Sequence, residues 1–151
     1  METNLNDVAQ QLLKDITNAA EQFKGISELE WALKPATSQW SKKEILGHLI
    51  DSAANNHLRF VRAQLAEEEF VSHAYEQDFF VSSQHYQERS TTDLIQLWLA
   101  YNKYLSHVIK HINPAKLNTI CKIGSYEPVT LGFIVSDYVT HLEHHLSQIL
   151  T

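Results

Sequence analysis

Cysteine is nearly absent from this sequence, since Cys121 is the only one among 151 residues. A lone cysteine cannot form an intramolecular disulfide, which excludes the disulfide-stapled class of small secreted domains. The same shortage excludes a structural zinc site built from several cysteines. The opening residues METNLN have neither the basic nor the apolar segment of a secretory signal. We therefore expect a cytoplasmic protein in which Cys121 is a small apolar residue rather than a nucleophile.

Long apolar runs and clusters of basic residues are also missing. No uncharged apolar stretch approaches the roughly 20 residues that cross a membrane as a helix. The twelve lysines and arginines are scattered and the formal net charge is −6, which disfavours a nucleic-acid surface. We expect a small-molecule substrate, no nucleic acid and no membrane partner. The length fits a single domain over residues 1–151.

Glycine and proline, at four and three residues, are too few to interrupt most of the chain. Four segments carry apolar residues at the three- and four-residue spacing of an amphipathic helix. The second segment opens with Ser41-Lys42-Lys43-Glu44, which has the pattern of a capping box. The sequence therefore predicts an all-α four-helix bundle. Its helices are expected at residues 4–23, about 41–68, 90–112 and 130–150.

Two long connections are expected, one between the second and third helices and one between the third and fourth. The first is rich in aromatic residues and has no clear period, and the second, residues 117–129, has the pattern of an extended excursion or hairpin. A short helical turn is also expected near residues 28–33. Connections of this length in a small domain usually either cover part of the domain or carry a function.

Two histidines fall within the apolar stripe of the last helix. At about 100° per residue, His141 and His145 lie roughly 40° apart, whereas His144 points about 80–100° away from them. Two neutral imidazoles one turn apart can converge on one divalent metal ion. The alternative is a pair of histidines that simply satisfy each other in the core. We interpret His144 as a solvated residue or as one that donates a hydrogen bond to a ligating residue.

A third ligand should be another histidine or a carboxylate on a different helix. His48 is the first choice because it borders the core face of the second helix, and His57 is the second choice. A polar line of His48, Ser52, Asn55 and Arg59 runs along that helix at spacings of four, three and four. This line fits either the wall of a cavity or the edge of a bundle or dimer. A site with three protein ligands keeps a position open for water or substrate.

Two motifs resemble those of the DinB/YfiT-like superfamily. The first is WSKKEILGHLIDSA at residues 40–53, followed by Asn55, Asn56, Arg59 and Phe60, and the second is HLEHH at residues 141–145, followed by Gln148 and Ile149. The resemblance covers essentially the whole chain and implies a four-helix bundle with a site for nickel or zinc. The ligands that it implies are His48, His141 and His145. It also implies a homodimer, because many members are dimeric.

The resemblance leaves the reaction open. Some relatives are thiol S-transferases that use a low-molecular-weight thiol, and others look like metal-dependent hydrolases or isomerases. The leading hypothesis is a metalloenzyme that activates a thiol or water. The alternatives are a metal-dependent hydrolase, a non-enzymatic, metal-stabilised and stress-related dimer, and a small-molecule-binding module without metal.

Three further side chains have predicted roles beside the ligands. Asp137 and Glu44 each precede a histidine by one turn, so each could accept the second ring N–H of that histidine and fix its tautomer. Arg59, if it faces inward, is suited to clamp a carboxylate of the substrate or of the thiol.

Overall fold

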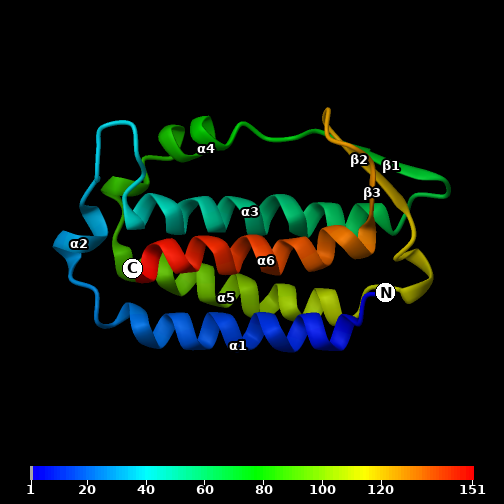
Figure 1. Ribbon diagram of the computed structural model, residues 1–151, viewed down its shortest axis with the longest axis horizontal. Coiled ribbons are helices and arrows are strands. Elements are labelled where there is room, and N and C mark those ends of the chain that lie inside the picture. Colours follow the sequence, from blue (N-terminus) through cyan, green and yellow to red (C-terminus); the bar gives the residue numbers. More distant parts are fainter. Residues whose placement is uncertain (1) are drawn as a thin grey trace.

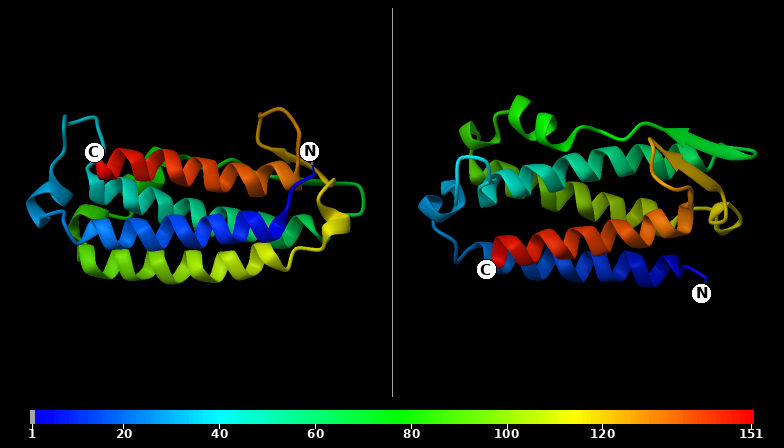
Figure 2. Two further views of the ribbon diagram at one scale, coloured as in Figure 1. Left: turned by 60° about the horizontal axis from the view of Figure 1, so that its bottom comes forward. Right: turned by 45° about the horizontal axis from the view of Figure 1, so that its top comes forward.

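Four long helices pack side by side in the computed structural model, which describes residues 2–151 (Figure 1). They are α1 (Leu5–Phe23), α3 (Lys42–Ala63), α5 (Thr91–Lys110) and α6 (Leu131–Leu150). Helices α1 and α6 run in one direction and α3 and α5 in the other, and each helix contacts two of the others, in the cyclic order α1, α5, α3, α6 (Figure 2). The predicted four-helix bundle is confirmed.

The helices start where their capping residues predict. Ser41 accepts a hydrogen bond from the amide of Glu44, and the Glu44 side chain accepts one from the amide of Ser41, so the predicted capping box is confirmed. The side chains of Asn4, Ser90 and Thr130 cap the other three long helices. A second capping box, from Ser27 to Glu30, begins the short helix α2 (Glu28–Ala32), where a helical turn was expected.

Helix α3 ends at Ala63, five residues before the predicted end near residue 68. Its last turn tightens, because the amides of Leu65 and Ala66 bond to carbonyls only three residues back. The run of three glutamates at residues 67–69 then disfavours another helical turn, since negative charges are unfavourable near the C-terminal end of a helix. The chain instead extends into strand β1 (Glu69–Ser72).

The two long connections meet in a small sheet. The first holds β1, helix α4 (Gln77–Ser83) and a 3₁₀ turn (Tyr86–Glu88), and the second holds a 3₁₀ turn (Pro114–Lys116), β2 (Ile120–Ile123) and β3 (Val129–Thr130). Strand β2 pairs antiparallel with β3, as the hairpin expectation required, and parallel with β1, which the sequence did not predict. The pairing of β1 with β2 fastens one connection to the other beside α3 and α6 (Figure 1).

One apolar core lies between the four helices and includes all three tryptophans at least in part. Trp31 and Trp98 are buried, and Trp40 is half-buried against the same core. Cys121 is also buried, as expected of a small apolar residue. None of the helices in residues 2–151 combines the length and the apolar character needed to cross a membrane.

Candidate metal centre

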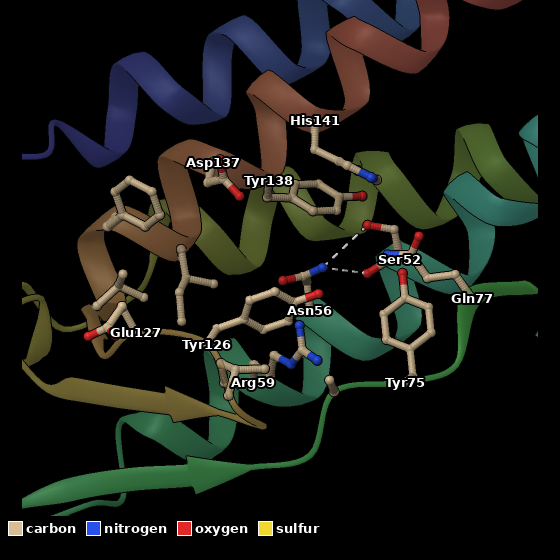
Figure 3. Close-up of a pocket in the computed structure, with 15 residues that line it drawn as sticks. Ser52, Asn56, Arg59, Tyr75, Gln77, Tyr126, Glu127, Asp137, Tyr138 and His141 are labelled. Carbon is tan, nitrogen blue, oxygen red and sulfur yellow. Dashed lines mark hydrogen bonds between the residues drawn. The ribbon is translucent and has the colours of Figure 1, made fainter.

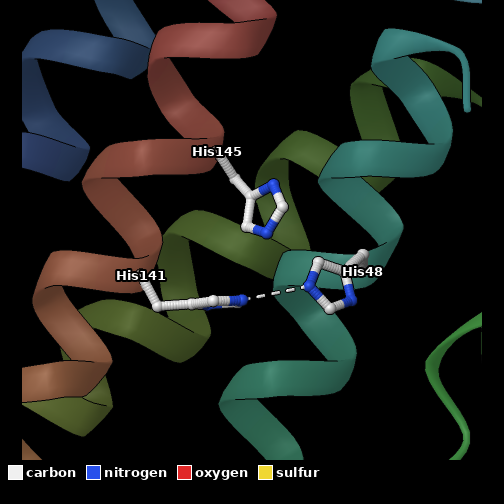
Figure 4. Close-up of side chains that lie close together, drawn as sticks. All are labelled: His48, His141 and His145. Atoms are coloured by element: carbon white, nitrogen blue, oxygen red, sulfur yellow. Dashed lines mark hydrogen bonds between the residues drawn. The ribbon is translucent and has the colours of Figure 1, made fainter.

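Three histidines from two facing helices meet between α3 and α6 (Figure 4). His48 comes from α3, and His141 and His145 come from successive turns of α6. The Nε2 atoms of His48 and His141 are 3.2 Å apart. The ring of His145 lies 4.7 Å from that of His48 and 4.5 Å from that of His141, between centroids. One ring nitrogen from each residue lies within 4.8 Å of the other two, so the structure brings together the three predicted ligands.

This arrangement fits the coordination chemistry of a divalent ion. With zinc–nitrogen bonds of 2.0–2.1 Å, two ligands of a tetrahedral ion lie about 3.3 Å apart, close to the separation of the His48 and His141 nitrogens. His48 is fully buried, whereas His141 and His145 are half-buried. The cluster thus has a closed side within the bundle and a side that solvent or a ligand can reach.

Burial keeps the three imidazoles neutral. Loss of solvation lowers the pKa of His48 to about 3 and that of His141 to about 4. His145 adds to both effects, together with His141 for His48 and with His144 for His141. Burial also lowers the pKa of His145. Because a metal ligand must carry a free lone pair, the cluster is in its binding form at neutral pH.

Gln148 orients one of these histidines, which the sequence reasoning missed. The Nδ1 atom of His145 donates to Oε1 of Gln148 at 2.8 Å, which leaves Nε2 of His145 with a free lone pair. The amide nitrogen of Gln148 lies 3.4 Å from Nε2 of His144, an exposed residue outside the cluster. The spacing of Gln148, three residues after His145, was the available signal for this contact.

The carboxylates expected to orient the histidines lie elsewhere. No hydrogen bond joins Asp137 to any of the three histidines within residues 2–151; its exposed side chain lines a cavity beside His141. Glu44 instead completes the capping box and bonds to Lys34 at 2.8 Å. The Nδ1 atom of His48 is buried without a hydrogen-bond partner in the described chain, and the Trp40 ring packs against the imidazole at 4.9 Å.

His57, the second choice for the third ligand, does not join the cluster. Its Nδ1 atom lies 2.8 Å from the hydroxyl of Tyr101, and its ring packs edge-on against Tyr101 and Tyr104 of α5. The helical period explains the difference, because nine residues from His48 is two and a half turns and places His57 on another face of α3.

A buried carboxyl group next to His48 anchors the first connection. Asp51 accepts hydrogen bonds from the hydroxyl of Tyr86 at 2.6 Å and from the amide of Gln84 at 2.7 Å. Burial raises the pKa of Asp51. The Tyr86 ring lies so close to Gly47 that a Cβ atom there would come within 2.2 Å of it. Gly47 thus leaves the space in which Tyr86 holds the connection against α3.

A cavity of about 550 Å³ opens beside His141 (Figure 3). Helices α3 and α6 form one side of it and the two connections form the other. Arg59 and Asp137, both singled out in the sequence, line it. Ligand sites of small molecules typically have this size. The polar line on α3 therefore contributes to a cavity wall through Ser52 and Arg59.

The sequence profile of the DinB superfamily matches residues 11–149. The chain belongs to the DinB superfamily. Its structure resembles that of YfiT from Bacillus subtilis, with a TM-score of 0.83 and 16% identity, over 96% of this chain and 83% of YfiT. YfiT is described as a probable metal-dependent hydrolase with an unusual four-helix bundle topology. No functionally curated protein matches the chain.

Proposed function

We propose that this DinB-superfamily protein is a metalloenzyme in which His48, His141 and His145 hold one divalent ion, zinc or nickel. The convergence of one ring nitrogen from each histidine supports the proposal. Three protein ligands leave a position of a tetrahedral ion free, which is typical of catalytic rather than structural sites. When bound, such an ion supplies Lewis-acid chemistry by lowering the pKa of a coordinated thiol or water.

The leading reaction is thiol transfer with a low-molecular-weight thiol from solution. The protein's own thiol is unsuited to this role, because Cys121 is fully buried and burial raises its pKa to about 11. Hydrolysis is the second candidate, and the description of YfiT favours it. In either reaction the chain keeps the three imidazoles neutral and holds an electrophilic substrate in the cavity beside His141.

Metal content of ligand variants tests the proposal. The protein is purified without a polyhistidine tag and analysed for metal, together with His48→Ala, His141→Ala, His145→Ala and His144→Ala. We expect each of the first three variants to lose stoichiometric metal, because removing one ligand from a preformed site removes most of the binding free energy. His144→Ala should retain it, since its exposed ring lies outside the cluster.

Circular dichroism of the same variants provides the control. The apolar core does not depend on the ion, so all four variants should keep the helicity of the parent protein. If His144→Ala loses the ion while His141→Ala keeps it, the ligand assignment is wrong.

Cobalt substitution separates an enzyme from a metal-stabilised bundle. An open site should exchange its remaining ligand when cysteine or azide is added, and the visible spectrum should change. A spectrum that neither addition alters would indicate a closed site and would support the non-enzymatic alternative.

A further inference from the structure

Arg59 is a cation without a counter-ion on the wall of the cavity. Its guanidinium group donates one hydrogen bond, from Nη2 to the carbonyl of His73 at 3.1 Å, and lies 5.9 Å from the centre of the Tyr75 ring. No carboxylate of residues 2–151 lies within ion-pair distance of it. A guanidinium group has five N–H donors, so several remain for a ligand.

Burial makes this unpaired charge costly. Arg59 is half-buried, and burial lowers the pKa of its guanidinium group, because the protein solvates the charge less well than water does. A half-buried cation in an acidic protein usually finds a carboxylate of the same chain. An anion that enters the cavity would supply the missing partner and would form two parallel hydrogen bonds with the guanidinium fork.

The other charged residues of the cavity limit the charge of that anion. Asp137 of α6 and Glu127 of the second connection also line it (Figure 3). Their negative charges disfavour a dianion such as a phosphate monoester and tolerate a single negative charge better. A carboxylate has one charge and the planar geometry that matches arginine.

The remaining walls are mainly apolar or aromatic and come from both connections and α6, notably Tyr75, Tyr126, Phe133 and Ile134. Such walls bind an apolar body by removing it from water. Arg59 lines the cavity from α3 and His141 lines it from α6. A molecule that contacts both residues must therefore extend across the cavity.

We propose that the cavity binds a monocarboxylic acid with an apolar body, whose carboxylate pairs with Arg59 and whose far end lies beside His141. The inference rests on the proposed function only for the reaction at that far end. Binding of the acid itself depends on Arg59 and the cavity walls. The two proposals can therefore fail separately.

Calorimetric titration with matched probes tests this inference. The probes are 6-phenylhexanoate, its neutral amide and 6-phenylhexyl phosphate, and the proteins are the full chain, Arg59→Gln, Arg62→Gln and His48→Ala. Arg62 is the control because it is an exposed arginine on the same helix outside the cavity. We expect the parent protein to bind the acid at least about 10-fold more tightly than the amide or the phosphate.

The variants should distinguish a contribution of the Arg59 charge to binding from a contribution of its side chain to the shape of the cavity. Arg59→Gln should weaken binding of the acid about 10-fold or more and leave the amide within about twofold. Arg62→Gln should change neither, and His48→Ala should keep the preference for the acid. Equal weakening of acid and amide by Arg59→Gln would show that Arg59 only shapes the wall, and would overturn the inference.

Three other outcomes would also overturn it. These are a parent protein that binds no acid, a parent protein that prefers the phosphate, and an acid whose binding survives Arg59→Gln but is lost in His48→Ala. The last result would place the carboxylate on the metal and would leave the proposed function intact. A preference for the acid in a protein that never contains metal would sink the proposed function and sustain this inference.

Discussion

At the scale of single residues, the hydrogen bond from His145 to Gln148 decides which nitrogen of that imidazole faces the centre of the cluster. The bond places a proton on Nδ1 and so presents the lone pair of Nε2 to the other two histidines. Partners of this kind fix the orientation of a ligating histidine and raise its basicity. Gln148 is therefore a positioning residue for the proposed ligand set.

Gln148→Ala should lower the affinity for zinc about 10–100-fold, because His145 then loses the acceptor that fixes its ring. Gln148→Glu retains an acceptor and should restore most of the affinity. Competition with a chromophoric chelator measures all the variants. Asp137→Asn is the control: with no hydrogen bond to the cluster in residues 2–151, it should change the affinity by less than about threefold. If Asp137→Asn lowered the zinc affinity more than Gln148→Ala does, Asp137 rather than Gln148 would be the orienting residue.

The helical period was sufficient to select the histidines but not their partners. His141 and His145 were identified because they fall in an apolar stripe, and His48 because it borders the core face of its helix. These placements depend only on local geometry. Asp137 has the required spacing, but its side chain faces the cavity. Spacing places two side chains on one face, and only packing decides which of them touch.

At the scale of elements, the start of α3 is the joint between the bundle and the first connection. The hydroxyl of Ser41 accepts from the amide of Glu44 at 3.1 Å and donates to Oε1 of Gln87 at 2.6 Å. Gln87 in turn donates to the carbonyl of Ala32. One buried hydroxyl group therefore links the cap of α3 to two segments outside it.

Ser41→Ala should lower the free energy of unfolding by about 1–2 kcal/mol, at the upper end of the range for loss of an N-cap. The cap is lost, and Oε1 of Gln87 loses the donor that it has at the buried Ser41. Ser90→Ala is the matched control, since Ser90 caps α5 from an exposed position and has no second partner among the described hydrogen bonds. It should cost about 0.5–1 kcal/mol. Urea denaturation measures both, and equal losses would contradict the role of the second bond.

The elements that sequence reasoning missed depend on contacts between distant residues. Strand β1 has no recognisable alternation of its own and exists because it pairs with β2, about fifty residues later. The helix starts were predictable because caps use neighbouring residues, such as Ser41 and Glu44.

At the scale of the whole molecule, the exposed surface of α3 and α5 carries large apolar side chains. Leu58, Val61, Leu97 and Tyr104 are each 45% to 55% exposed. His57 joins the two helices there, because its ring packs against that of Tyr104. Contiguous apolar patches on a protein surface mark interaction sites. We propose that two copies of the chain associate through this surface.

The parent protein should sediment as a dimer in analytical ultracentrifugation, and the double variant Leu58→Glu/Tyr104→Glu should sediment as a monomer. Two buried charges without partners on each side of the interface make association unfavourable. Leu29→Glu is the control, since Leu29 is 81% exposed on α2, away from this surface, and the variant should remain a dimer. A monomeric parent protein, or a double variant that still dimerises, would contradict the proposal.

The walls of the cavity come from two parts of the chain, the helices and the connections, which tolerate amino-acid substitution to different degrees. One wall, which includes His141, belongs to α3 and α6, where a shift in register would disturb the packed core. Tyr75, Gln77, Tyr126 and Glu127 project from the connections, where substitutions cost little stability. Descendants of this sequence could therefore exchange one bound molecule for another through the connections while inheriting the same three imidazoles unchanged.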